Sequence, residues 1–161
     1  MPKRFSLAAL TGIIAVAAFA GVTLATPGVG VTNTTIATGN LPATFAMVKT
    51  GDWKLNLRTK GDSDVIVTES RLVPGATFGW HSHPGPSLVV VKSGTLSFYR
   101  GDDPTCTAQI FQAGDVLIDS GNVVHVGRNE GSVDLVVLTT RLIPDGATAR
   151  IDEPAPGNCS F

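Results

Sequence analysis

The sequence contains few charged side chains, few aromatic side chains and no cluster of basic residues. Charged residues make up 16% of the 161-residue chain, aromatic residues 6%, and the formal net charge is −1. No basic run follows Lys3-Arg4. Because proteins that bind nucleic acid carry clustered Lys and Arg, we expect no nucleic-acid partner.

Sustained helical spacing of apolar residues is also missing after the N-terminal segment. The chain is 43% hydrophobic and rich in Gly, Val and Thr, a composition that fills a core and favours strands. Short strands separated by turns at intervals of roughly ten residues predict an all-β sandwich or small barrel. Besides the segment around His81, the predicted strands cover residues 45–48, 53–59, 64–73, 87–92, 95–100, 109–111, 115–119, 123–128 and 133–143.

The N-terminus has the pattern of an export signal. Lys3-Arg4 precedes an uncharged apolar run, and Thr23-Leu24-Ala25 offers small residues for cleavage. We therefore predict a signal peptide over residues 1–25, a secreted or extracytoplasmic protein, and no membrane association once the signal is removed. The alternative is an uncleaved anchor, since about 20 apolar residues can span a bilayer. Residues 26–44, composed mainly of Thr, Gly, Asn and Pro, are predicted to form a flexible linker.

Only two cysteines are present, Cys106 and Cys159, and both lie beside turn-forming residues. An even number of cysteines in an exported chain favours a disulfide over two free thiols. The bond would tie a C-terminal tail, residues 146–161, to the domain predicted over residues 45–145.

Histidine is equally scarce, and the three histidines fall into a pattern. His81 and His83 are one residue apart in a predicted strand, so their side chains point to the same side. His125 lies in a second Val-rich segment. If these strands cross, three imidazoles converge, and the sequence predicts a metal site with open coordination positions.

The spacing around these histidines resembles two motifs of the cupin superfamily. The resemblance covers residues 70–130 and implies an all-β jelly-roll barrel, or double-stranded β-helix, with a metal at its mouth. By position, His81, His83 and His125 match the metal-binding histidines of the family. The residues that carry the resemblance are Gly75, His81, His83, Ser87 and Gly94 in the first motif and Gly114, Ser120, His125 and Asn129 in the second.

The chain departs from the family pattern at three positions. Ser87 stands where the family usually has a glutamate ligand, and Ser120 and Asn122 replace a proline and a glycine. A serine hydroxyl is a poor ligand for a divalent ion, so we expect three neutral imidazoles and no carboxylate. An anionic molecule would then complete the coordination. Iron, copper, zinc, manganese and nickel all suit such a site.

Other residues have weaker claims to a functional role. Glu69 and Arg71 lie on one face of a predicted strand, either inside the barrel or as solvent-facing ion-pair partners. Tyr99 either donates a hydrogen bond to a ligand or packs in the core. We assign Trp80 to packing, Asn129 to a turn, and Asp102-Asp103 to a solvated turn rather than a calcium site.

Two functional hypotheses follow from this pattern and resemblance. The first is a metal-dependent enzyme, such as an iron or copper dioxygenase, acting on a small extracellular molecule. The second is a non-catalytic protein that binds a small anion or the metal itself; a vestigial site is a third possibility. Because cupins often pair through their sheets, a homodimer is also possible.

Overall fold

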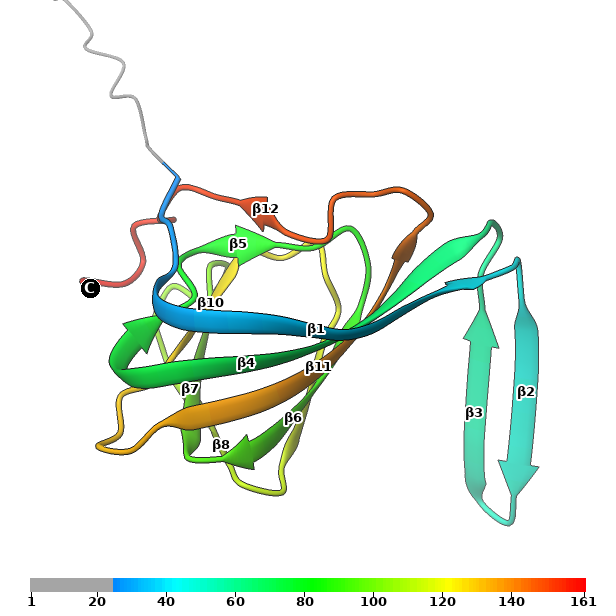
Figure 1. Cartoon of the computed structure of the whole chain (residues 1–161), viewed down its shortest axis with the longest axis horizontal. Helices are drawn as coiled ribbons and strands as arrows, with labels where there is room; N and C mark the ends of the chain where they lie inside the picture. Colours follow the sequence, from blue (N-terminus) through cyan, green and yellow to red (C-terminus); the bar gives the residue numbers. More distant parts are fainter. Residues whose placement is uncertain (1–24) are drawn as a thin grey trace, which may run out of the picture.

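The computed structural model describes residues 25–161 as an all-β jelly-roll barrel (Figure 1). Most of the predicted signal peptide, residues 1–24, lies outside the described residues. No helix within 25–161 is long and apolar enough to cross a membrane. The strands are β1 (Val29–Leu41), β2 (Phe45–Thr50), β3 (Trp53–Arg58), β4 (Ser63–Thr77), β5 (His81–Ser82), β6 (Ser87–Ser93), β7 (Thr95–Arg100), β8 (Gln109–Gln112), β9 (Val116–Asp119), β10 (His125–Arg128), β11 (Leu135–Pro144) and β12 (Ile151–Asp152).

Ten of these strands form one antiparallel sheet that curls around the core. Along its main path the order is β12-β5-β10-β4-β11-β6-β9, with β1 added beside β4 and β7 joining β10 to β8. Alternate residues of each strand point inward, because successive side chains lie on opposite faces. The buried apolar core consists of Leu72, Ala76, Val91, Leu96, Phe98, Leu117, Leu135 and Val137.

The predicted flexible linker over residues 26–44 is wrong for most of its length. Val29–Leu41 forms β1, which pairs antiparallel with β4 from Val29↔Thr77 to Leu41↔Ser63. Most of its side chains are exposed, so the strand shows no apolar alternation. Its regular structure comes from the backbone ladder with β4, reinforced by a 2.6 Å hydrogen bond that the Ser70 hydroxyl donates to Asn33 Oδ1. Thr, frequent in this stretch, is a β-branched residue that suits such a strand.

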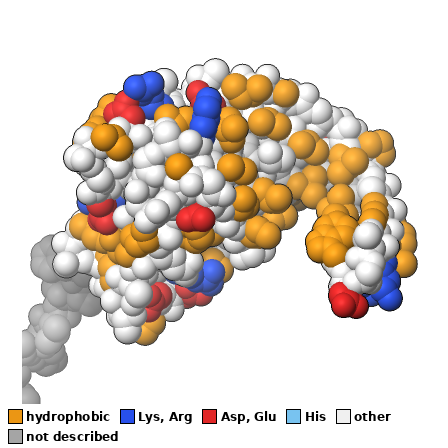
Figure 2. Space-filling view, turned by 90° about the horizontal axis from the view of Figure 1, so that it is seen from below, with side chains coloured by type: hydrophobic (Ala, Val, Ile, Leu, Met, Phe, Trp, Pro, Cys, Tyr) orange, Lys and Arg blue, Asp and Glu red, His pale blue; other side chains and the backbone are white. Residues whose placement is uncertain are grey.

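The sequence predicts that the barrel begins at residue 45, and this boundary is also wrong: β1 already belongs to the barrel sheet, whereas the strands after residue 45 do not. Strands β2 and β3 form a separate two-stranded sheet that projects from the barrel (Figure 1). The apolar and polar residues of β3 alternate as in a half-buried strand, but the barrel does not cover its apolar side. Figure 2 shows this hairpin with hydrophobic side chains on its surface. Its large exposed apolar residues are Phe45, Met47, Val48, Trp53 and Leu55.

The C-terminal tail lies against the barrel and is covalently attached to it. The predicted disulfide between Cys106 and Cys159 is present, with 53 residues of sequence separation. Beyond it, the Phe161 ring stacks on Trp80 at a centroid distance of 6.2 Å, and the Arg128 guanidinium lies 4.0 Å from the Phe161 ring centroid. The tail thus contributes β12, which pairs with β5, and covers that end of the barrel.

Candidate metal centre

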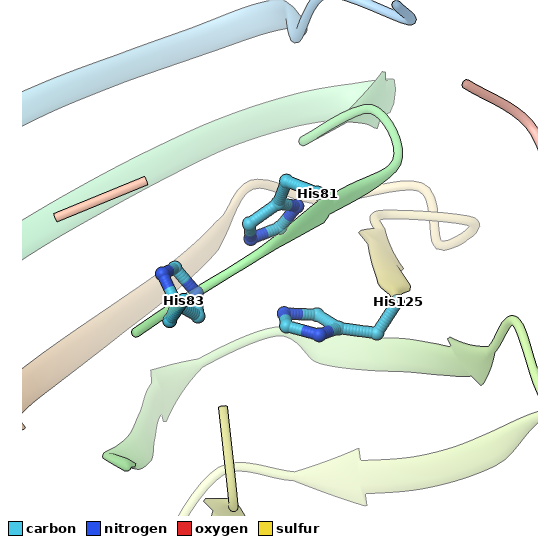
Figure 3. Close-up of side chains that lie close together, drawn as sticks. All are labelled: His81, His83 and His125. Carbon is cyan, nitrogen blue, oxygen red and sulfur yellow. The ribbon is translucent and has the colours of Figure 1, made fainter. Parts of the chain in front are cut away.

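The three histidines meet inside the barrel, as the sequence predicts (Figure 3). They lie on or beside two neighbouring strands. His81 is the first residue of β5, His83 directly follows β5, and His125 is the first residue of β10. Antiparallel pairing of β5 with β10 places His81 opposite His125. One potential ligand atom from each ring lies within 4.8 Å of the others, and all three residues are buried.

Each imidazole is oriented by a hydrogen bond to a backbone carbonyl. The Nδ1 atom of His81 lies 2.9 Å from the Gly79 oxygen, that of His83 2.7 Å from the Ala149 oxygen, and that of His125 2.8 Å from the Val123 oxygen. Since a carbonyl only accepts, each Nδ1 carries the proton, and each neutral ring presents an unprotonated Nε2. Metal-binding histidines are usually oriented in this way. The residues therefore fit a divalent ion.

Burial keeps these rings uncharged. Desolvation, reinforced by the neighbouring His125, lowers the pKa of His81 from 6.5 to about 2. Desolvation also lowers the pKa of His83 to about 4, although its hydrogen bond to Ala149 acts in the opposite direction. Burial lowers the pKa of His125 despite attraction from Asp119. Neutral imidazole is the form that binds a metal ion.

A cavity of about 230 Å³ adjoins the three rings. Its walls are mainly apolar, with Phe78, Leu96, Phe98, Leu117 and Val137 among the lining residues. The cavity has room for a small organic molecule next to the imidazoles.

The cavity also contains an acidic residue, Asp119, that the sequence motifs do not mark. It is 7% exposed, and its Oδ2 atom lies 3.5 Å from His125 Nε2 and 3.7 Å from His83 Nε2. Burial raises the pKa of its carboxyl group, although the nearby His125 acts in the opposite direction. The alternation of β9, in which Leu117 and Asp119 both point inward, was the available signal. The expectation of a site without a carboxylate is therefore wrong for the cavity as a whole.

Arg141 is a second polar residue of the cavity that no sequence motif marks. It occupies an inward position of β11, two residues from the buried Thr139 and Ile143, and lines the cavity. One of its terminal nitrogens donates a 3.2 Å hydrogen bond to the Thr68 hydroxyl, whereas its buried Nε has no partner among the described residues. Burial, followed by repulsion from Arg150, lowers the pKa of its guanidinium. The sequence indicated this role, because Arg141 is an even number of residues from apolar positions that face the core in the same strand.

Glu69 and Arg71 lie on the outside of β4, so neither reaches the cavity. Lys92 Nζ is 2.9 Å from Glu69 Oε2, and Arg71 Nε donates a 2.7 Å hydrogen bond to Asp134. The solvent-facing interpretation is confirmed, with Lys92 and Asp134 as the partners.

The remaining candidates have structural roles. Tyr99 is buried and donates a 2.8 Å hydrogen bond to Glu130. Trp80 packs with Tyr99 and Val126 in a second core cluster. Asn129 is fully buried, and its side-chain nitrogen donates to the carbonyls of Leu72 and Val133.

The Asp102-Asp103 segment is a hydrogen-bonded turn, as predicted. Asp102 pairs with Arg100 at 2.8 Å, and Asp103 accepts hydrogen bonds from the backbone nitrogens of Thr105 and Thr107. Its carboxylates are thus engaged within the turn itself.

The lowered histidine pKa values predict a pH-dependent stability of the metal-free protein. Between about pH 4 and 6.5 the unfolded chain binds protons at His81 and His83 that the folded chain does not bind. The free energy of unfolding is therefore greatest above pH 6.5. It decreases as the pH is lowered, by about 1.4 kcal/mol per proton per pH unit at most. From pH 7 to 5.5 we expect a loss of about 2 to 3 kcal/mol, measurable by urea unfolding with a chelator present.

The His81→Ala variant is the control for this prediction, because it removes one of the protons that unfolding takes up. Its stability should depend less steeply on pH in the same window, because His83 and His125 still contribute. A free energy of unfolding that stays constant from pH 7 to 5.5 in the parent protein would contradict the prediction.

Comparison with known proteins agrees with the architecture. Residues 68–141 match the family model of the cupin domain. No curated protein sequence matches the chain. A conserved protein with a double-stranded β-helix domain from Klebsiella pneumoniae is 23% identical, with 55% of this chain and 75% of that chain covered and a TM-score of 0.46.

Two proteins from Thermotoga maritima are also similar in structure. A cupin-like protein is 25% identical, with 56% of this chain and 65% of that chain covered and a TM-score of 0.47. A predicted oxalate decarboxylase is 24% identical, with 52% of this chain and 83% of that chain covered and a TM-score of 0.41.

Proposed function

The chain belongs to the cupin superfamily, and on that premise we propose that it binds one divalent transition metal ion through His81, His83 and His125. The observation that carries this proposal is the common orientation of the rings. All three Nδ1 atoms face backbone carbonyls, which leaves the unprotonated Nε2 atoms for a metal ion. The ion we propose is iron, copper, zinc, manganese or nickel, all of which bind imidazole nitrogen. When bound, such an ion supplies a Lewis acid beside the cavity.

We further propose that the cavity receives a small anionic molecule. Arg141 supports this proposal, because it lines the cavity and its buried Nε has no partner among the residues that the structure describes. Arg150, the other cationic residue of the wall, is already engaged: it pairs with Asp152 at 2.6 Å and donates to the Phe78 carbonyl at 2.6 Å. Arg141 is thus the side chain available to orient a carboxylate or another oxyanion.

Oxygen-dependent cleavage of the bound molecule is the second candidate function. The apolar walls of the 230 Å³ cavity favour it, because they would separate a small organic substrate from bulk water. The alternative is a protein that binds the metal and the anion without turnover. The Cys106–Cys159 disulfide supports a location outside the cytoplasm, where such bonds persist.

Metal titration of the purified, chelator-treated chain tests the proposal. We expect one equivalent of Zn(II), Cu(II), Ni(II), Mn(II) or anaerobic Fe(II) per chain; failure of every ion to bind stoichiometrically would overturn the metal site. Acetate binding to the loaded protein should weaken about tenfold in Arg141→Met, but not in Lys92→Met, which removes an exposed charge outside the barrel. Oxygen uptake with diketones or phenolics then separates the enzyme from the binding protein.

A further inference from the structure

We infer that Asp119 is a fourth ligand of the ion, and that it replaces from β9 the carboxylate that Ser87 cannot provide from β6. The inference rests on the proposed metal site. It concerns a residue outside the positions that carry the resemblance to cupins.

The pairing of β6 with β9 connects the two positions. Ser87 and Asp119 are directly opposite each other in this antiparallel ladder. Both are buried and both line the cavity. Directly opposed residues have Cβ atoms only about 4.5–5.5 Å apart, so an aspartate at 119 can reach much of the space that a glutamate at 87 would fill.

The orientation of Asp119 singles out one oxygen for an ion. Its Oδ1 accepts a 3.0 Å hydrogen bond from the Gly121 backbone nitrogen, which fixes the carboxylate. Its Oδ2 is buried and has no hydrogen-bond partner among residues 25–161. Within the part of the chain that the structure describes, no Lys or Arg forms an ion pair with it, and the titratable side chains within 4 Å of it are the two neutral histidines.

Those two contacts bring the carboxylate oxygen close to two nitrogen lone pairs. The Nδ1 protons of His83 and His125 are directed to backbone carbonyls, so both Nε2 atoms are acceptors. An ionised carboxylate oxygen at 3.5 Å and 3.7 Å from two acceptors is an unfavourable arrangement unless a proton or a cation lies among them. A divalent ion coordinated by Oδ2 and the Nε2 atoms resolves it, and the carboxylate lowers the net charge of the site by one.

The alternative role for Asp119 is purely structural, as the acceptor that holds the turn at Gly121. The two roles use different oxygens and make different predictions. Asp119→Asn retains a side-chain oxygen for Gly121 and removes the negative charge, so it distinguishes the two roles directly. Asp115→Asn is the matched control, because Asp115 is an exposed aspartate that precedes the same strand.

The test compares metal affinity, measured by chelator competition with Zn(II), and the absorption spectrum of the Co(II) form. We expect Asp119→Asn to weaken affinity about 100-fold and to change the Co(II) spectrum, while Asp115→Asn changes neither. The double variant Ser87→Glu/Asp119→Asn returns a carboxylate to the cavity from β6, and we expect it to recover affinity to within about tenfold of the parent.

An Asp119→Asn protein with parental affinity and a parental Co(II) spectrum would overturn the inference while leaving the three-histidine site standing. A parent protein that binds no ion would overturn the proposed function as well. Urea unfolding of the metal-free proteins separates loss of a ligand from loss of the fold, and we expect Asp119→Asn to be no less stable than the parent.

Discussion

Replacement of His81 by alanine is expected to lower the affinity for a divalent ion by more than about 100-fold. Loss of an outer hydrogen-bond partner of a ligand already costs up to about that factor, and loss of the ligand itself costs more. The metal-free fold should persist, because the His81 ring lies at the cavity whereas the main core is made by Leu72, Val91, Leu135 and their neighbours. Metal analysis after gel filtration, together with thermal unfolding of the metal-free variant, measures both effects.

Ser87→Ala is the matched control for this experiment. Ser87 is 1% exposed and lines the same cavity, but its hydroxyl is a poor metal ligand and has no hydrogen-bond partner in the described part of the chain. Removing this hydroxyl should leave the affinity within about threefold and the stability equal or slightly higher, because a buried unpaired group is lost. Full metal retention in His81→Ala, or equal losses in both variants, would contradict the proposed centre.

Removal of the disulfide by Cys106→Ala/Cys159→Ala is expected to lower the free energy of unfolding by about 4 kcal/mol. The bond spans 53 residues of sequence, and opening a loop of this length restores much conformational freedom to the unfolded chain. Urea unfolding of the oxidised parent and of the double variant measures the difference.

Reductant provides the internal control for this second prediction. It should destabilise the parent protein to the level of the double variant and have no further effect on the variant itself. Two titratable thiols in the oxidised parent, or a variant as stable as the parent, would contradict the prediction.

The histidine centre was predictable because local rules suffice to place its parts. The spacing of His81 and His83 fixes a common face, and the resemblance to the cupin motifs links them to His125. Asp119 was not predictable in the same way, because its role depends on the register that sets Ser87 opposite it. A pairing between two strands separated by a hairpin and a loop is a property of the folded sheet, which spacing within one strand does not specify.

Arg141 and β1 show two other limits of prediction from the sequence. Arg141 lies in the most apolar of the predicted strands. Because most of that strand is hydrophobic, it was assigned to the core as a whole, and the inward-facing position of its single arginine was not recognised. In β1 nearly all side chains face solvent, so no apolar period marks the strand. Its β-structure arises from pairing with β4, an interaction between backbones that composition alone does not show.

The backbone oxygen that orients His83 belongs to Ala149, ten residues before Cys159 in the C-terminal tail. This carbonyl lies between β11 and β12, in a stretch held by the pairing of β12 with β5. The segment that follows the last long strand of the barrel therefore orients one of the imidazoles. A change that displaces this stretch is expected to release the His83 ring while leaving the residue itself intact.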